Sequence, residues 1–372
     1  MRTIRMPAPS RARPSTVLLL LVGLVALAAG VGLGPRHYAE EGLTGTAATG
    51  AVLLVAGAAL VIWGTIRVLA SIRRRWWTPV VLLVLVATFL SLWTLGQAVA
   101  AAYAPRPELG ARTPADLGVV FRDVTFPSGD GVELAGWYVP TRNGAAVALM
   151  HGAGSTRSGE LEHAAVLAEH GYGVLLFDAR GHGESEGRSM DFGWYGEADA
   201  SGAVDFLAGE PGVAAGRIAL VGTSMGGEQA IGAAGADSRV AAVVAEGATN
   251  RVAADKGYLE AAYGARGAVQ QHIDAVTYWF TDLLSDAPRP LPLRDSVSIA
   301  TSRSDPTAFL LIAAGDRRDE SLAADYVQQR GNGLVQTWTV PEAGHTQALE
   351  TAPEEWEERV LDFLDDSLDG RR

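Results

Sequence analysis

Three long runs near the N-terminus are almost wholly apolar. They cover Thr16–Gly34, Ala47–Ala70 and Pro79–Tyr103. At about 1.5 Å per helical residue, each is long enough to cross a hydrocarbon core of about 30 Å. Buried core helices would give similar runs, but three in succession, each flanked by charge, favour a membrane. We therefore predict a membrane region over residues 1–104, with spans at about 16–34, 47–70 and 79–103.

The distribution of arginine sets the expected orientation of these spans. Four arginines precede the first run and three separate the second from the third: Arg2, Arg5, Arg11, Arg13, Arg73, Arg74 and Arg75. Because cytoplasmic segments are rich in Lys and Arg, three spans place the C-terminal part outside the cytoplasm. The basic start and Ala26–Ala28 also resemble a signal peptide. Its cleavage would leave two spans and the same orientation.

After a proline-containing linker at 105–118, residues 119–372 alternate between strand and helix patterns. Two strands joined by Ser128–Gly131 indicate a hairpin. Later apolar runs such as Ala145–Met150 are continuous, as expected of strands buried on both faces. The expected strands are Val119–Phe126, Val132–Val139, Ala145–Met150, Val174–Phe177, Ile218–Val221, Ala241–Ala245, Ala308–Ala313 and Gln336–Val340. This order predicts an α/β fold with a mostly parallel, eight-stranded sheet flanked by helices.

A segment of about 248–306 interrupts the alternation. Its apolar residues, including Val276, Trp279, Phe280 and Leu283, recur at roughly helical spacing. An ordinary packed helix would explain this spacing. So would a cap over a binding site, because long insertions at strand ends often shape pockets. The sequence leaves both interpretations open.

Composition excludes several function classes. Residues 1–112 carry 11 Arg and 3 Glu, a balance of +8, against −12 for the whole chain, which leaves −20 for residues 113–372. An acidic domain of this kind is not expected to bind nucleic acid. There is no cysteine, so disulfides, thiol catalysis and cysteine-bound metals are excluded. Neither a metal nor an organic cofactor is implied, and oligomeric state has no signal in the sequence.

The pattern Gly222-Thr223-Ser224-Met225-Gly226 follows an apolar strand and opens a helical pattern. Such a turn is so sharp that side chains at the glycine positions would clash, and it exposes the serine oxygen at a helix N-terminus. A glycine-rich turn with a capping serine would show the same letters. The strand before it and the helix after it favour a nucleophile at Ser224.

A serine hydroxyl needs a base, and the base needs a carboxylate that fixes its tautomer. His345, just after the last expected strand, is the candidate base. Of the other histidines, His163 and His170 look like surface helix positions. Asp319 is the favoured carboxylate, with Asp316 and Glu246 as alternatives.

An oxyanion formed at Ser224 also needs hydrogen-bond donors. The loop His151–Gly154 follows the third expected strand. The backbone N–H groups of Ala153 and Met225 are expected to converge on that oxygen. A plain glycine turn is the alternative for this loop.

Together these motifs resemble the α/β-hydrolase superfamily over about Val119–Leu364, and its dienelactone-hydrolase-like and prolyl-oligopeptidase-like branch in particular. The resemblance rests on His151–Gly154, the string Phe177–Ser185, the Ser224 motif and Gly344-His345. It implies that Asp178 and Arg180 tie down the loop that follows the fourth strand. The chain departs from the family where the acid often stands three residues after the strand-end glycine, because that position is Arg318.

The expected protein is a multi-pass cell-membrane serine hydrolase whose extracytoplasmic domain cleaves a small-molecule ester or related acyl bond through Ser224. A peptidase or thioesterase would use the same residues. The alternative from another class is a catalytically silent membrane protein that binds lipid or a partner on this fold. The expected partners are the acyl substrate and the lipid bilayer.

Overall fold

A computed structural model describes residues 14–369, which form two compact units. The helical unit comprises the described chain up to Pro105 together with Ile273–Ser285. The sheet unit comprises Arg106–His272 and the described chain from Asp286 onward. Arg2, Arg5, Arg11 and Arg13, which contribute to the predicted orientation, lie outside the described residues.

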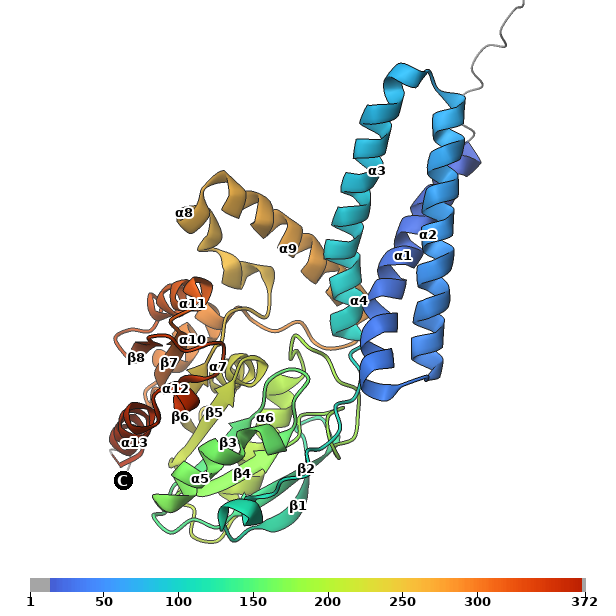
Figure 1. The fold of residues 1–372 in the computed structure, drawn as a ribbon. Coiled ribbons are helices and arrows are strands. Elements are labelled where there is room, and N and C mark those ends of the chain that lie inside the picture. The colour runs from blue at the N-terminus through green and yellow to red at the C-terminus, as the bar shows by residue number, and fades with distance from the viewer. Residues whose placement is uncertain (1–13, 370–372) are drawn as a thin grey trace, which may run out of the picture. The chain divides into compact units, whose positions relative to one another are not determined.

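The elements are labelled in Figure 1 in chain order. The strands are β1 Arg122–Pro127, β2 Glu133–Val139, β3 Ala146–Met150, β4 Gly173–Phe177, β5 Ile218–Thr223, β6 Val240–Glu246, β7 Ala308–Ala314 and β8 Val335–Val340. The helices are α1 Pro14–Glu41, α2 Gly45–Ser71, α3 Trp77–Ser91, α4 Gln97–Ala102, α5 Leu161–Glu169, α6 Gly196–Ala208, α7 Met225–Ala236, α8 Leu259–Tyr263, α9 Ala265–Leu284, α10 Leu293–Thr301, α11 Arg318–Gln328, α12 Ala348–Thr351 and α13 Pro353–Asp369.

The helical unit contains the three predicted apolar helices. They are α1, α2 and a continuous helical run over Arg74–Ala102 that includes α3 and α4, and each is long and apolar enough to cross a membrane. Helices α1 and α2 approach closely at glycines. A Cβ added at Gly57 would lie 2.3 Å from the backbone nitrogen of Leu27, and one at Gly50 would lie 2.4 Å from Cα of Gly34. Small residues at such crossings are typical of helices that pack within a membrane.

The sheet unit confirms the predicted fold. Its eight strands are ordered β1-β2-β4-β3-β5-β6-β7-β8. Strand β2 pairs antiparallel with β1 and β4, which is the expected hairpin start, and the pairs from β4 to β8 are all parallel. The carboxyl ends of β3, β5, β6, β7 and β8 therefore lie at one edge of the sheet, where the predicted site residues follow them.

Helices cover both faces of this sheet. Helices α6, α7, α10 and α11 pack on one face, and α5 and α13 pack on the other. Each face of the sheet has its own hydrophobic core, the first under α6, α7, α10 and α11 and the second under α5 and α13. In β3, Ala148 and Met150 pack in the first core, whereas Val147 and Leu149 pack in the second, because alternate side chains of a strand point to opposite faces. Helix α10 lies within the predicted insertion, yet it belongs to the first core through Leu293 and its neighbours.

The predicted linker at 105–118 is bound to the sheet unit. The guanidinium of Arg106 donates to the carbonyl oxygens of Gly183 at 3.2 Å, Gly187 at 3.1 Å, and Ser185. The N–H of Gly183 donates back to the carbonyl of Pro107 at 3.0 Å. The start of the linker is thus hydrogen-bonded to the loop after β4, through Arg106 and Pro107.

Candidate active site

Ser224 stands at a tight turn between β5 and α7. Its φ is 50° and its ψ is −118°. Residues other than glycine rarely adopt this backbone conformation, which is typical of strained functional turns. A Cβ added at Gly222 would lie 2.3 Å from the carbonyl carbon of Gly226, and one at Gly226 would lie 2.0 Å from the carbonyl oxygen of Met150. The glycines are therefore required by close backbone approach, as the sequence pattern predicted.

His345 meets this serine from the loop after β8. Its Nε2 lies 2.9 Å from the Oγ of Ser224, and its Nδ1 lies 2.6 Å from an oxygen of Glu320. The backbone of Gly247 packs against the ring, because a Cβ there would lie 2.9 Å from Cε1 of His345. The two residues that the sequence paired as nucleophile and base are thus within hydrogen-bond distance, although 121 positions separate them.

The prediction that Asp319 is the carboxylate partner of His345 is wrong in this structure. The carboxylate of Asp319 accepts a hydrogen bond from the hydroxyl of Tyr263 at 2.5 Å instead. The alternatives also fail: Asp316 lies 3.7 Å from the Nε of Arg317, and Glu246 accepts from the backbone N–H of Ala348 at 2.8 Å.

Glu320, which the sequence analysis missed, takes the place of Asp319. It stands in the first turn of α11, where a negative charge is favourable, and its side chain is 5% exposed. One oxygen contacts His345 and the other accepts the N–H of Ala314 at 2.9 Å, so the carboxylate is fixed at both oxygens. Its hydrogen bond raises the pKa of His345 above the ordinary value.

The loop after β3 lies directly against Ser224. A Cβ at Gly152 would lie 3.4 Å from Cβ of Ser224. Among the described residues, neither the N–H of Ala153 nor that of Met225 donates to another backbone group. The N–H of Met225 is at the start of α7, where helix amides have no intrahelical acceptor. Both predicted oxyanion donors are therefore unused within the backbone.

Two buried histidines shape the surrounding loops. Nε2 of His151 accepts the N–H of Ala179 at 3.0 Å, so its Nδ1 carries the proton and donates to the carbonyl of Gly152 at 2.9 Å. Burial lowers the pKa of His151, and it lowers the pKa of His182 to about 3. Both rings are neutral at physiological pH. They also lie against each other, with centroids 4.9 Å apart, so they pack the loop after β3 against the loop after β4.

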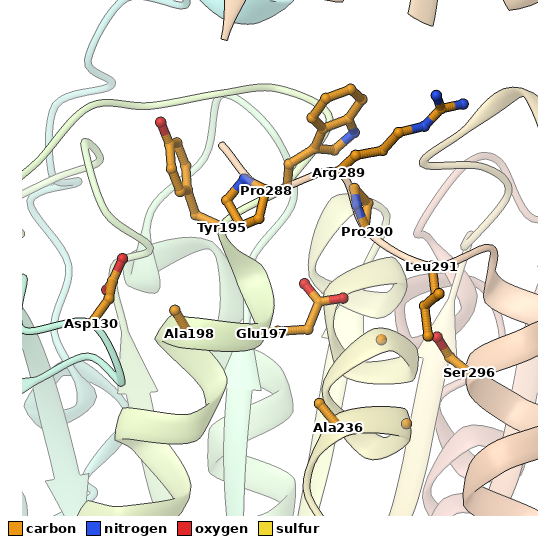
Figure 2. A pocket seen from close by; sticks show the side chains of 13 residues that line it. Asp130, Tyr195, Glu197, Ala198, Ala236, Pro288, Arg289, Pro290, Leu291 and Ser296 are labelled. Carbon is orange, nitrogen blue, oxygen red and sulfur yellow. The ribbon is translucent and has the colours of Figure 1, made fainter. Parts of the chain in front are cut away.

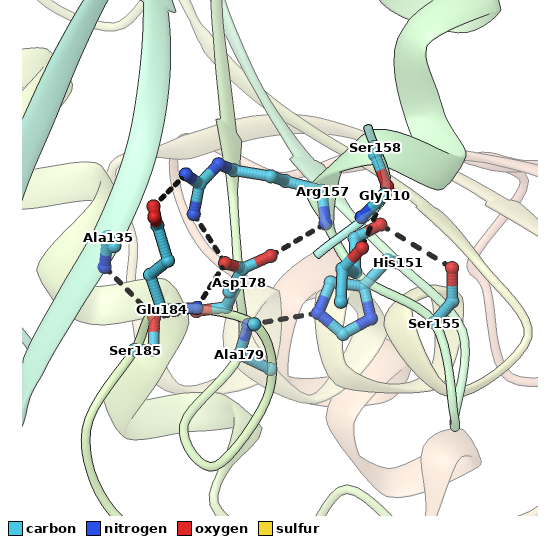
Figure 3. Close-up of polar contacts among 12 residues, drawn as sticks. Gly110, Ala135, His151, Ser155, Arg157, Ser158, Asp178, Ala179, Glu184 and Ser185 are labelled. Carbon is cyan, nitrogen blue, oxygen red and sulfur yellow. Dashed lines mark hydrogen bonds and ion pairs between the residues drawn. The ribbon is translucent and has the colours of Figure 1, made fainter. Parts of the chain in front are cut away.

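Ion pairs hold the loop after β4, as Figure 3 shows for Asp178. That carboxylate pairs with the guanidinium of Arg157 and accepts the backbone N–H groups of Arg157 at 2.8 Å and Glu184 at 3.0 Å. Arg180 similarly binds Asp130 and Asp199. These contacts match the structural roles that the resemblance implied for Asp178 and Arg180.

The expected surface position of His163 is wrong. Its ring is buried beside the ring of Trp356, with centroids 5.1 Å apart, and lies 3.1 Å from the carboxylate of Glu160. Glu160 also accepts from the hydroxyl of Thr223, the residue before the nucleophile, at 2.6 Å. The buried carboxylate of Glu160 therefore stabilises the turn at Ser224 through Thr223.

Glu228 is a second buried carboxyl that the sequence analysis missed. It lies one helical turn after Ser224, and its oxygen accepts the N–H groups of Thr249 at 3.0 Å and Asn250 at 2.8 Å. Burial raises its pKa to about 7. Glu228 therefore fixes the loop after β6, the loop that also carries Gly247 against His345.

A cavity of about 470 Å³ opens beside His345. Its walls are mostly polar and charged, and they comprise Thr249, Tyr263, Asp316, Arg317, Arg318, Asp319, Glu320 and His345. A separate, mainly apolar hollow of about 270 Å³, drawn in Figure 2, is lined by residues such as Tyr195, Pro288 and Leu291 and contains none of the three residues Ser224, His345 and Glu320. Over residues 14–369 no group of three or more His, Asp or Glu side chains is arranged to hold a metal.

Comparison with protein-family models matches residues 141–305 to the family described as serine aminopeptidase, S33. An uncharacterized protein of Mycobacterium tuberculosis is 40% identical over 116 residues, which are 30% of this chain and 41% of that protein. A thiohydrolase of Aspergillus aculeatus is 38% identical over 133 residues, 33% of this chain and 40% of its own. The chain thus spans less than half the length of these curated relatives.

Solved structures share the fold. An esterase of Pyrococcus furiosus matches with a TM-score of 0.57 and 24% identity, covering 72% of this chain and 98% of that chain. A protein of Penicillium described as an alpha/beta hydrolase matches with a TM-score of 0.51 and 20% identity, covering 67% and 99%. At these identities the similarity shows the fold alone.

Proposed function

We propose that this chain, which has the fold of the α/β hydrolases, is a membrane-anchored serine hydrolase that cleaves an ester or related acyl bond through an acyl-enzyme on Ser224. The observation that carries this proposal is the contact series Ser224 Oγ to His345 Nε2 at 2.9 Å and His345 Nδ1 to Glu320 at 2.6 Å. A serine oxygen at a strained turn, a ring nitrogen and a buried carboxylate in this order are the parts that acyl transfer needs.

In the proposed reaction, the Oγ of Ser224 attacks the acyl carbonyl carbon while Nε2 of His345 takes the hydroxyl proton. Glu320 holds the ring in the tautomer with a proton on Nδ1 and stabilises the resulting imidazolium. The oxyanion accepts the N–H groups of Ala153 and Met225. His345 then donates its proton to the leaving alcohol, and the same steps with water release the acid and restore Ser224.

A fluorophosphonate probe tests the proposal on the full chain. Such a probe reacts with an activated serine, so we expect labelling of the wild type and none of Ser224→Ala. Ser201 in α6 offers a control, because Ser201→Ala should leave labelling unchanged. If Ser224→Ala were labelled as strongly as the wild type, Ser224 would not be the nucleophile and the proposal would fail. A folded wild type that stays unlabelled would favour the silent binding protein.

Amide and thioester hydrolysis are the second candidate function on the same residues. The matched family is described as a serine aminopeptidase, and one relative is named a thiohydrolase. Matched p-nitrophenyl esters, thioesters and aminoacyl amides, each measured beside Ser224→Ala, separate these activities. The reaction with the largest serine-dependent kcat/KM identifies the bond class.

Anchoring is proposed from the three apolar helices and the placement of arginines. Arg73–Arg75 separate the second helix from the third, and we propose that they face the cytoplasm and that the sheet unit lies outside. A C-terminal alkaline phosphatase fusion is expected to be active. Activity from a C-terminal cytoplasmic reporter instead would reverse the orientation.

A further inference from the structure

The second half of α9 belongs to the helical unit, not to the sheet unit. Ile273–Ser285 groups with the chain that contains the three apolar helices. The hydroxyl of Tyr103, the residue directly after α4, donates to the carbonyl of Leu284 at 3.4 Å. The C-terminal end of α9 is therefore attached at the position where the third apolar run ends.

This segment buries three polar side chains, together with Tyr278, and exposes an apolar stripe. Val276, Trp279 and Leu283 are 44%, 58% and 69% exposed. On the opposite side, Asp274, Thr277 and Thr281 are all buried. Residues 276, 279 and 283 follow the i, i+3, i+7 spacing of one helical face, so the three exposed side chains form a single stripe.

Such an arrangement is the reverse of a helix that packs on a water-soluble domain, whose apolar stripe faces the core. It is the arrangement of a helix in lipid, where apolar side chains face outward and polar or ionisable ones face the bundle. The neighbouring helices of the same unit follow this rule, since Leu82 of α3 and Val52 of α2 are also largely exposed. The stripe therefore continues the apolar outer surface of the helical unit.

The depth of the segment is indicated by Trp279 and Asp282. Tryptophan is enriched where hydrocarbon meets the headgroups. Asp282 is exposed beside the stripe, and a charge there is tolerated at the interface far better than at the centre of a bilayer. Together with the attachment at Tyr103, these features favour the boundary region over a transmembrane position.

We propose that Ile273–Ser285 lies in the bilayer interface at the end of the third span, with Val276, Trp279 and Leu283 in contact with lipid acyl chains. The proposal rests on the membrane anchoring proposed above and extends it to a segment 170 positions further along the chain. The insertion would then attach the protein to the membrane at a second place. There are two alternatives: the stripe is covered by protein, or it is exposed to water. The test must distinguish both from contact with lipid.

Because the chain contains no cysteine, single-cysteine variants of the full protein need no background substitutions. Val276→Cys and Leu283→Cys would carry a nitroxide in phosphatidylcholine–phosphatidylglycerol vesicles. Three positions calibrate the signal: Leu82→Cys in α3 for lipid, Val120→Cys, 83% exposed in the sheet unit, for water, and Thr281→Cys for a protein interior. The measurement is the collision rate of each nitroxide with oxygen and with a water-soluble nickel chelate.

At positions 276 and 283 we expect an oxygen-to-nickel ratio close to that at Leu82 and at least several-fold above that at Val120. A ratio like that at Val120 would place the stripe in water and overturn the proposal. Low rates with both reagents, as at Thr281, would show that protein covers the stripe and would also overturn it.

The same samples separate this inference from the proposed function. If Leu82→Cys itself reports water, the membrane anchoring fails, and the interface segment fails with it. Fluorophosphonate labelling at Ser224 in each variant reports on the catalytic residues independently of lipid contact. A labelled protein with a water-exposed stripe would therefore refute only the interface segment.

Discussion

The helical unit and the sheet unit use the same apolar residue types in opposite places. In the sheet unit, Val147 and Leu149 are fully buried between two helical layers. In the helical unit, Val52 and Leu82 are largely exposed, while Gly50 and Gly57 make the close helix contacts. With the helical unit in a membrane, as proposed, burial from water stabilises only the sheet unit, whereas close packing of small residues stabilises the helical unit.

The chemistry is expected to depend on the sheet unit and on one carboxylate in it. Glu320→Gln should lower kcat/KM for a p-nitrophenyl ester by about 10³- to 10⁴-fold, because an amide at this position favours the wrong histidine tautomer and cannot stabilise the imidazolium. Asp319→Asn is the matched control, since Asp319 contacts Tyr263 and not His345, and it should cost less than about tenfold. A larger loss in Asp319→Asn than in Glu320→Gln would restore Asp319 as the acid.

The stability of the sheet unit is expected to depend on its buried ion pairs. Arg157 and Asp178 are both buried, and Arg157→Ala would leave the carboxylate without its charge partner. We expect a loss of about 3–5 kcal/mol in the free energy of unfolding, measured by denaturant titration. Arg112→Ala, which removes an exposed pair with Glu162, should cost about 0–1 kcal/mol. Equal losses would mean that burial does not separate the two pairs.

The helical unit should respond to added volume at its glycines. In Gly57→Ala the new methyl group meets the backbone of Leu27, so α1 and α2 must separate; we expect a loss of about 1–3 kcal/mol, measured by unfolding in mixed detergent. Gly45→Ala, with open space at its Cβ, is the control and should be close to neutral. Both variants should keep the kcat/KM of the wild type. A stabilised Gly57→Ala would contradict close packing.

The smallest expected effect is on the pH profile. The proposed reaction needs neutral His345, so kcat/KM should fall as pH falls through its pKa. The hydrogen bond that Nδ1 of His345 donates to Glu320 raises that pKa above the ordinary value of about 6.5, so the acidic limb of the profile should lie above pH 6.5. In Glu320→Gln the limb should move to lower pH, measured on the residual activity. A wild-type limb below pH 6.5 would contradict the assigned contact.

The sequence predicted those features that depend on neighbouring residues. Continuous apolar runs identified the buried strands, and the glycines around Ser224 identified its turn, because both follow from local backbone geometry. The acid could not be chosen in this way. Asp316, Asp319 and Glu320 stand within five positions, and only the start of α11 at Arg318 decides which side chain points toward His345.

Contacts between distant segments explain the other differences. His163 is buried because Trp356, nearly two hundred positions later, covers it. The second half of α9 likewise groups with residues far away in the sequence, and Tyr103 contacts Leu284 there. Helical spacing in the insertion could be recognised from the sequence, but which side of the helix faces protein could not.

The attachment of Arg106 has a practical consequence for preparing a soluble enzyme. A fragment cut at the predicted domain start, residue 119, would lack that guanidinium and would leave the carbonyl oxygens of Gly183, Ser185 and Gly187 without their shared donor. The same loop contains Glu184, which binds Arg157. Recombinant versions should therefore begin at or before Pro105, even though that choice retains residues that look dispensable.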